Sequence, residues 1–196
     1  MLVIKWKRSD CLSFQSEHSI LISPVEDFNP DLLESISREV QRLFGYRTEI
    51  MSLLQDVGFA LDPGRDQHHS TLILEKLAGL APARVIKVLA VTRVDLFIPI
   101  LTHVYGEAQI GGRACILSTH RLNEGLATSA REIFNQRVVK ETIHELGHTF
   151  NLRHCQEHAC IMHYCRSIKD VDRKADQLCR YCRILLADEL KRLAAT

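Results

Sequence analysis

The sequence has no long hydrophobic run and no excess of charge of one sign. Its most apolar stretch, residues 85–101, is interrupted by Lys87, Arg93 and Asp95 and contains Pro99, so it cannot span a bilayer. The 25 basic and 24 acidic side chains leave a formal net charge of +1 and are spread along the chain. We therefore expect neither a nucleic-acid nor a membrane partner, and we expect a monomer.

The N-terminal segment also lacks the features of a targeting signal. Its first residues, MLVIKWKR, contain no apolar core of the kind that a secretory signal requires, so we expect a cytoplasmic protein. The 196 residues, 46% of them hydrophobic, suffice for one compact domain with a sizeable core. We expect residues 1–152 to form its N-terminal part and residues 153–196 its C-terminal part.

Hydrophobic patterns and turn residues predict a mixed sheet with helices, followed by an irregular tail that ends in a helix. Asn29-Pro30 predicts the start of a helix that Gly45 ends, and Ser70 and Asp176 are expected to cap two later helices. The expected helices cover residues 30–44, 70–80, 132–152 and 177–193, and the expected strands cover residues 2–6, 48–54, 84–91, 96–100 and 114–118.

Cysteine and histidine are concentrated in the C-terminal third. Of the seven cysteines, five lie between Cys155 and Cys182, and of the ten histidines, five lie between His144 and His163. In a reducing compartment, cysteines at short spacings are more often metal ligands than disulfide partners. This region is therefore where we expect the chemistry.

Residues 144–148, His-Glu-Leu-Gly-His, match the pattern H-E-x-x-H. Positions i and i+4 share one face of a helix, so His144 and His148 can bind the same zinc ion. Glu145 lies beside them and can accept a proton from a water that the metal activates. The motif predicts metal-assisted hydrolysis, although five residues alone also occur by chance.

A third histidine extends this pattern. His154 would lie about 15 Å from His144 along an unbroken helix, whereas zinc requires each ligand at about 2.0–2.1 Å. The helix must therefore stop and the chain must turn back. Asn151 stands where a left-handed residue is needed, and asparagine adopts that conformation more readily than most residues. Three protein ligands would leave a fourth position open for water.

The pattern H-E-x-x-H-x-x-N-x-x-H resembles the metzincin signature, with Asn151 where glycine normally stands. Metzincins also have a methionine turn beneath the metal, and Met162 in Cys160-Ile-Met162 fits that element. The resemblance implies a zincin-like fold of mixed α and β structure and a sheet edge that pairs with an extended peptide. We expect the strand at 114–118 to supply that edge.

Four cysteines follow the histidines in two pairs, Cys155-x4-Cys160 and Cys179-x2-Cys182. This spacing is typical of a tetrahedral structural zinc site without an open position. Because Cys155 directly follows His154, such a site would help to hold the third histidine in place. Together with the histidine motif, the pairs resemble the archaemetzincins, which implies a peptidase with two zinc ions per chain, one catalytic and one structural.

Other readings of these residues remain open. The cysteines could be buried apolar residues or a redox pair, and Cys165 could replace one of the four as a ligand. Cys11, Cys115 and Cys165 are expected to be structural, and the ligand role is only the alternative for Cys165. The protein could also bind zinc and peptides without cleaving them, or be an interaction module held together by the cysteine site alone. Neither the substrate nor the choice between endopeptidase and aminopeptidase follows from the sequence.

Several further residues carry weaker signals. Tyr164 follows Met162 by two residues, where astacin-like metzincins have a tyrosine that stabilises the developing oxyanion; plain packing is the alternative. His158 and His163 are expected near the site without binding metal, and the pair at 68–69 in a solvated turn. A last set could line a substrate cleft: His103, Tyr105 and His120.

Overall fold

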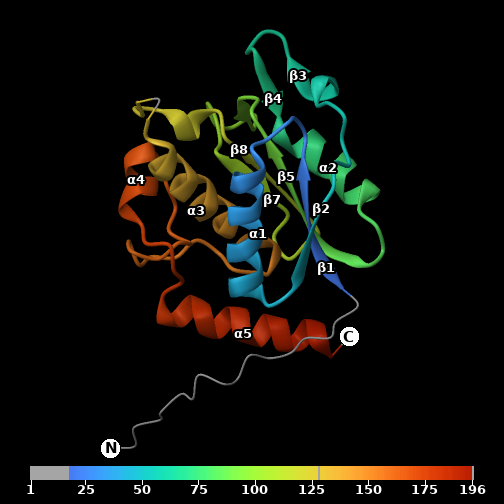
Figure 1. The fold of residues 1–196 in the computed structure, drawn as a ribbon, viewed down its shortest axis with the longest axis vertical. Coiled ribbons are helices and arrows are strands. Elements are labelled where there is room, and N and C mark those ends of the chain that lie inside the picture. Colours follow the sequence, from blue (N-terminus) through green and yellow to red (C-terminus); the bar gives the residue numbers. More distant parts are fainter. Residues whose placement is uncertain (1–17, 128, 196) are drawn as a thin grey trace, which may run out of the picture.

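The computed structural model describes residues 18–127 and 129–195, so the strand predicted at 2–6 and Cys11 lie outside the described residues. A five-stranded sheet forms its centre, in the order β2-β1-β5-β8-β7 (Figure 1). The first four strands run parallel and β7 runs antiparallel to β8. The strands comprise β1 (Ser19–Pro24), β2 (Arg47–Ile50), β5 (Val85–Thr92), β7 (Gly106–Ala108) and β8 (Ala114–Ser118).

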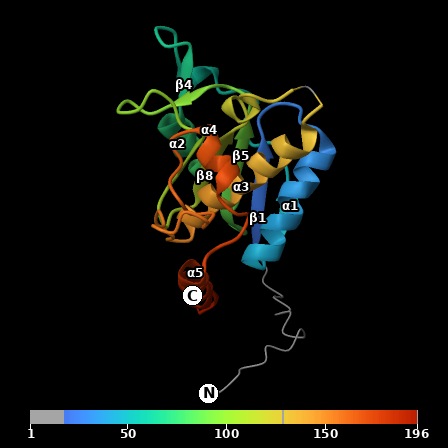
Figure 2. The same ribbon diagram turned by 90° about the vertical axis from the view of Figure 1, so that its left-hand side faces the viewer.

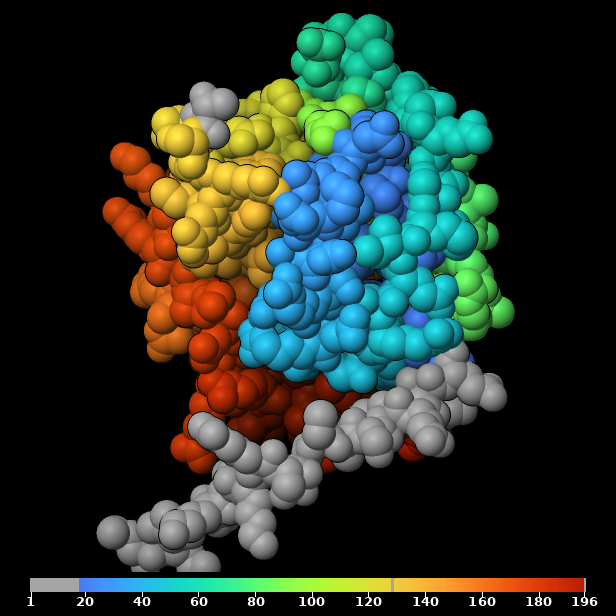
Figure 3. Space-filling model, viewed as in Figure 1, coloured from blue at the N-terminus to red at the C-terminus, as the bar shows by residue number. Residues whose placement is uncertain are grey.

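Helices cover both faces of this sheet, which explains why its inner strands are almost entirely buried and mostly apolar (Figure 2). Successive residues of a strand point to opposite faces. Accordingly, Cys115 and Leu117 belong to the core beneath α1 (Pro30–Phe44) and α3 (Arg131–Thr149). Ala114 and Ile116 face the second core, beneath α2 (Ser70–Leu80). In Figure 3, α1 and the first part of α3 form much of the surface that faces the viewer.

The capping residue was predicted correctly for one helix and wrongly for two others, although α2 covers the predicted residues 70–80. α1 starts and ends as predicted, because Asn29 Oδ1 accepts from the N–H of Asp31 and Gly45 adopts a φ of 77°. Ser70 does not cap α2, because its hydroxyl donates to the carbonyl of Phe97. The last helix, α5 (Arg180–Ala194), is capped by Cys179 rather than by Asp176, because the Cys179 sulfur accepts from the first turn of the helix.

Several short elements complete the fold. The predicted strands at 48–54 and 96–100 are shorter than expected, at Arg47–Ile50 and Leu96–Phe97, and the latter is β6. β6 joins a second, three-stranded sheet with β3 (Leu61–Asp62) and β4 (Gln67–His69). Single turns of 3-10 helix occur at Gly58–Ala60 and Arg121–Asn123, and α4 is a short helix at Ile168–Arg173. Within the described ranges, no helix has the length and apolarity to cross a bilayer.

Candidate active site and metal centres

Helix α3 carries His144, Glu145 and His148 on its buried last turns, where each is about 5–6% exposed. Because the two histidines are four residues apart, their rings lie on one face with centroids 4.7 Å apart. The helix ends at Thr149, three residues earlier than expected.

The chain then makes the reversal that the sequence requires. Asn151 has a φ of 61°, and the N–H groups of Asn151 and Leu152 donate to the carbonyls of His148 and Gly147. This pair of bonds is the Schellman arrangement, which ends a helix on a left-handed residue. The reversal brings the ring of His154 to centroid distances of 5.3 Å from His144 and 4.8 Å from His148. One nitrogen from each histidine lies within 4.8 Å of the others.

The hydrogen bonds of the first two histidines fit a metal at this point. His144 Nδ1 lies 2.9 Å from the carbonyl oxygen of Ile161, and His148 Nδ1 lies 2.7 Å from that of Leu152. A carbonyl oxygen only accepts, so each Nδ1 must donate, and in a neutral ring Nε2 then carries a lone pair. Burial favours neutral rings, because it lowers the pKa of His144 well below its usual value and that of His148 to about 4.

The two Nε2 atoms are nevertheless only 3.1 Å apart. Two lone pairs at this distance repel each other unless a cation lies between them. Tetrahedral zinc with Zn–N bonds of about 2.0–2.1 Å would separate two nitrogens by about 3.3 Å. The donor set therefore fits zinc in both chemistry and spacing.

Glu145 lies between its own helix and the outer strand β7. Gly106 of β7 makes room for it, because a Cβ atom there would lie 2.6 Å from Glu145 Cγ and 2.5 Å from the carbonyl oxygen of Ile116. Burial raises the pKa of the Glu145 carboxyl well above its usual value, and the nearby Glu141 adds to this effect. A carboxylate in such surroundings binds a proton more readily than an exposed one.

Met162, the residue expected to form the methionine turn of a metzincin, packs against α3 at Gly147, the residue before His148. Its side chain is fully buried, and a Cβ atom at Gly147 would lie 2.6 Å from its sulfur. The absence of a side chain at Gly147 therefore lets the methionine approach α3. The neighbouring carbonyl, that of Ile161, fixes the ring of His144.

A cavity of about 720 Å³ opens between β7 and α3, and the three histidines and Glu145 line it. The strand predicted as the sheet edge is not at the edge, because β8 pairs with β5 on one side and with β7 on the other. The strand that borders the cavity is β7, through Gly106, Glu107 and Ala108.

The weaker candidates fall into different places. His103, Tyr105 and Tyr164 line the cavity, whereas His120 lines a separate pocket. The Tyr164 ring lies 4.9 Å from the His154 ring, centroid to centroid. His158 and His163 pair with each other, with their ring nitrogens 3.1 Å apart. Residues 68–69 are half-buried in β4, not in a solvated turn.

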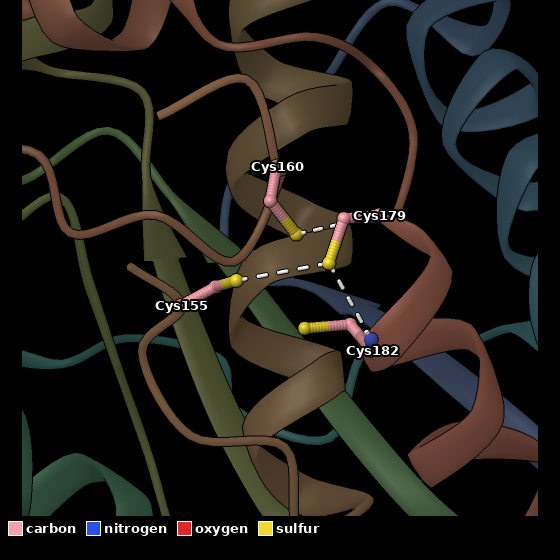
Figure 4. A group of neighbouring side chains, drawn as sticks. All are labelled: Cys155, Cys160, Cys179 and Cys182. Atoms are coloured by element: carbon pink, nitrogen blue, oxygen red, sulfur yellow. Dashed lines mark hydrogen bonds between the residues drawn. The ribbon is translucent and has the colours of Figure 1, made fainter. Parts of the chain in front are cut away.

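The four paired cysteines converge at the start of α5, each with its sulfur inside the group (Figure 4). The sulfurs of Cys155 and Cys179 are 3.7 Å apart. Backbone N–H groups also point at the cluster: that of Cys179 donates to the Cys160 sulfur and that of Cys182 to the Cys179 sulfur. These donors favour thiolates, and the group has the composition of a tetrahedral zinc site.

Cys165 stays apart from this group. It lines the active-site cavity, and its sulfur lies 3.6 Å from the carbonyl oxygen of His163. Burial raises the pKa of its thiol to about 11, so it remains protonated at neutral pH. Cys115 is fully buried in the core, and its sulfur lies 3.7 Å from the carbonyl oxygen of Val88.

The sequence did not predict an ion pair beside the cavity, between Lys174 and Glu141. Lys174 is buried, and its Nζ lies 2.6 Å from Oε1 of Glu141, which lines the cavity one turn before Glu145. The position of Glu141 could have been foreseen, since it is four residues before Glu145 on the same helix face. No sequence pattern marked Lys174 as its partner.

Comparison with known proteins agrees with this geometry. The family model for peptidase family M54 matches residues 74–188. The archaemetzincin of Methanocaldococcus jannaschii is 36% identical over 172 residues, which cover 86% of this chain and 93% of that protein. The archaemetzincin of Archaeoglobus fulgidus is 34% identical over 164 residues, 83% of this chain and 95% of that protein.

Solved structures give the same result. The crystal structure of archaemetzincin from Methanopyrus kandleri superposes with a TM-score of 0.82 at 31% identity, over 92% of this chain and all of that one. A zinc-dependent peptidase from Methanocorpusculum labreanum superposes with a TM-score of 0.77 at 26% identity, over 86% of this chain and all of that one. The family match, the relatives and the shared fold lead to one conclusion: this chain belongs to the archaemetzincins, peptidase family M54, and is a zinc metallopeptidase.

Proposed function

We propose that this chain hydrolyses peptide bonds with Glu145 as the general base and with zinc held by His144, His148 and His154. The observation that supports this most directly is the close approach of the Nε2 atoms of two histidines beside a buried carboxylate, in a cavity large enough for a peptide segment. Zinc bound there would act as a Lewis acid that lowers the pKa of a water molecule and polarises the scissile carbonyl.

The protein's own residues would handle the proton and the substrate. Glu145 takes a proton from the attacking water and delivers it to the leaving amine, a task for which a raised pKa is suited. Gly106 keeps its carboxylate beside the reacting carbon. The outer strand β7 borders the cavity and offers backbone groups for pairing with an extended peptide.

Tyr164 is a candidate for a further role in the same step. It lines the cavity, the residue is 42% exposed, and its ring lies against His154. We propose that its hydroxyl donates to the oxyanion as the tetrahedral intermediate forms. A Tyr164→Phe protein should then lose kcat with little change in KM, and an unchanged kcat would remove this role.

We further propose that Cys155, Cys160, Cys179 and Cys182 hold a second zinc ion with a structural role. Such an ion joins the segment after His154 to the start of α5, and no position remains open for substrate. We also propose one domain, with 1–152 and 153–196 as its two parts, a monomeric state and a cytoplasmic location.

Digestion of a peptide library by the wild-type protein and by a variant that lacks the Glu145 carboxylate tests the proposed mechanism. Glu145→Ala should keep its zinc and lose cleavage, because only the proton acceptor is removed. Glu132→Ala is a matched control, with the same substitution at an exposed site on the same helix, and should cleave normally.

Zinc content and cleavage together separate the alternatives. Two zinc ions with cleavage that depends on Glu145 support the proposal, and the cleavage sites then reveal polarity and side-chain preference. Two zinc ions without any cleavage indicate a peptide-binding protein. One zinc ion, lost when the cysteines are replaced, indicates an interaction module.

A further inference from the structure

His154 is held differently from the other two histidines. The rings of His144 and His148 are each fixed by a backbone carbonyl, whereas within the described part of the chain no hydrogen bond holds the ring of His154. His154 is also the one exposed member of the three. Apart from the ring contact with Tyr164, its position depends on the backbone on either side of it, between the turn at Asn151 and Cys155.

The turn itself is fastened to the last helix. Asn151 Nδ2 donates to Oε1 of Glu189, on α5, at 3.0 Å. A glycine at 151 would adopt the same backbone conformation but could not make this bond. The asparagine thus combines the left-handed conformation with a link to a helix 38 residues away in sequence.

Further contacts hold both side chains of this hydrogen bond in position. The Glu189 side chain is only 10% exposed, and Arg192 holds it with two bonds of 2.6 and 2.9 Å. On the other side, the Asn151 amide lies against Gly111, where a Cβ atom would come within 2.4 Å of Oδ1. The N–H of Gly111 donates to the carbonyl of His148. The amide therefore packs between α5 and the loop that closes the end of α3.

We propose that Asn151 and Glu189 are positioning residues that tie α5 to the third zinc ligand. His154 would then be fixed from both flanks by the same helix, since α5 also begins at the cysteine cluster that includes Cys155. This inference rests on the proposed function, because it assumes that His154 binds the catalytic zinc.

The rate at which a chelator removes zinc from the histidine site tests the link without reference to activity. Each zinc site should give its own kinetic phase of zinc release, and the phase that is missing from a His154→Ala variant is release from the histidine site. Asn151→Gly and Glu189→Ala should each speed this phase about three- to tenfold, somewhat less than the ~10–100-fold typical of groups that bond a ligand directly. Because both remove the same bond, the double variant should be no faster than the faster single variant.

A swapped pair provides the rescue. Asn151→Asp places two carboxylates together, so this variant should release zinc faster than Asn151→Gly. The double variant Asn151→Asp with Glu189→Gln reverses donor and acceptor and restores the hydrogen bond, so zinc release should return to within about threefold of the wild-type rate. Asp188→Ala is the control, since it removes an exposed acid from the same helix that pairs with Lys191, and it should leave release unchanged.

Three results would overturn the link: wild-type release in either single variant, a double variant whose effect is the product of the two, or a swapped pair as fast as Asn151→Asp alone. Failure of the proposed function looks different. In that case the wild-type protein has no release phase that depends on His154, or Glu145→Ala still cleaves peptides.

Discussion

The close approach of Gly106 to Glu145 allows a test of how precisely the proposed general base must be placed. In Gly106→Ala, the added Cβ would lie 2.6 Å from Cγ and 2.8 Å from Cδ of Glu145. Ordinary van der Waals contact begins at 3.4 Å. The carboxylate must therefore withdraw by about 0.6–0.8 Å, since 3.4 − 2.8 = 0.6 and 3.4 − 2.6 = 0.8.

The strand cannot relieve this contact by moving outward freely. The same Cβ would lie 2.5 Å from the carbonyl oxygen of Ile116, which belongs to the neighbouring strand β8. A misplacement approaching 1 Å typically costs about 100-fold in rate, so we expect kcat to fall on the order of 100-fold. The overpacking should also reduce the free energy of unfolding by about 1–3 kcal/mol.

Steady-state kinetics on a peptide cleaved by the wild-type protein, together with zinc content and thermal unfolding, would measure these effects. The expected variant stays folded, keeps its zinc and loses kcat. Gly79→Ala is a matched control, because a Cβ at that helical position would meet nothing within 4 Å apart from its chain neighbours and the nearby backbone of its own helix. A Gly106→Ala protein with wild-type kcat would refute the placement of Glu145 as the base.

Three other substitutions, one of them with a matched control, test the supports of the site. Lys87→Met removes the ammonium that bonds two carbonyl oxygens next to the end of α3, at 2.8 and 2.7 Å, and should cost about 2–4 kcal/mol in urea unfolding. Burial lowers the folded pKa of Lys87 to about 8, below its ordinary 10.5. Between pH 8 and 10.5 the unfolded chain therefore binds this proton more tightly than the folded protein does. The stability of the wild type relative to the variant should then rise with pH across this range. The bond from Arg137 lowers the folded pKa of Asp172 below its ordinary 3.8, so Asp172→Asn should be less stable than wild type at neutral pH. In urea melts this difference should shrink as the pH falls below 3.8 towards the lowered folded pKa. Cys182→Ser should halve the zinc content measured by elemental analysis, whereas Cys165→Ser should leave it unchanged.

The parts of the fold that local residues determine could be predicted from the sequence. The bounds of α1 follow from Asn29, Pro30 and Gly45, all of which act within one turn of the helix. The reversal at Asn151 likewise follows from the spacing of His148 and His154 and from the backbone preference of asparagine. In these cases the sequence shows both where a helix must start, end or reverse and which nearby residue allows it to do so.

Other features depend on contacts that no local pattern records. β7 has only three residues, Gly-Glu-Ala, and is a strand because β8 pairs with it. Since it was not foreseen, β8 was wrongly expected at the sheet edge. The start of α5 was misplaced for a similar reason: Asp176 is a good cap by local preference, but the geometry of the cysteine cluster places Cys179 at that point.

The chemistry and its supports differ in the same way. The proposed general base and the proposed ligands of the catalytic zinc lie between His144 and His154, so a motif can find them. The groups that fix their geometry come from strand β5 with Lys87, strand β7 with Gly106 and helix α5 with Glu189, and each contact spans a long stretch of sequence. Catalysis depends on placement as much as on residue type. An intact histidine motif alone is therefore weak evidence of activity, and the supporting residues should distinguish active from inactive relatives.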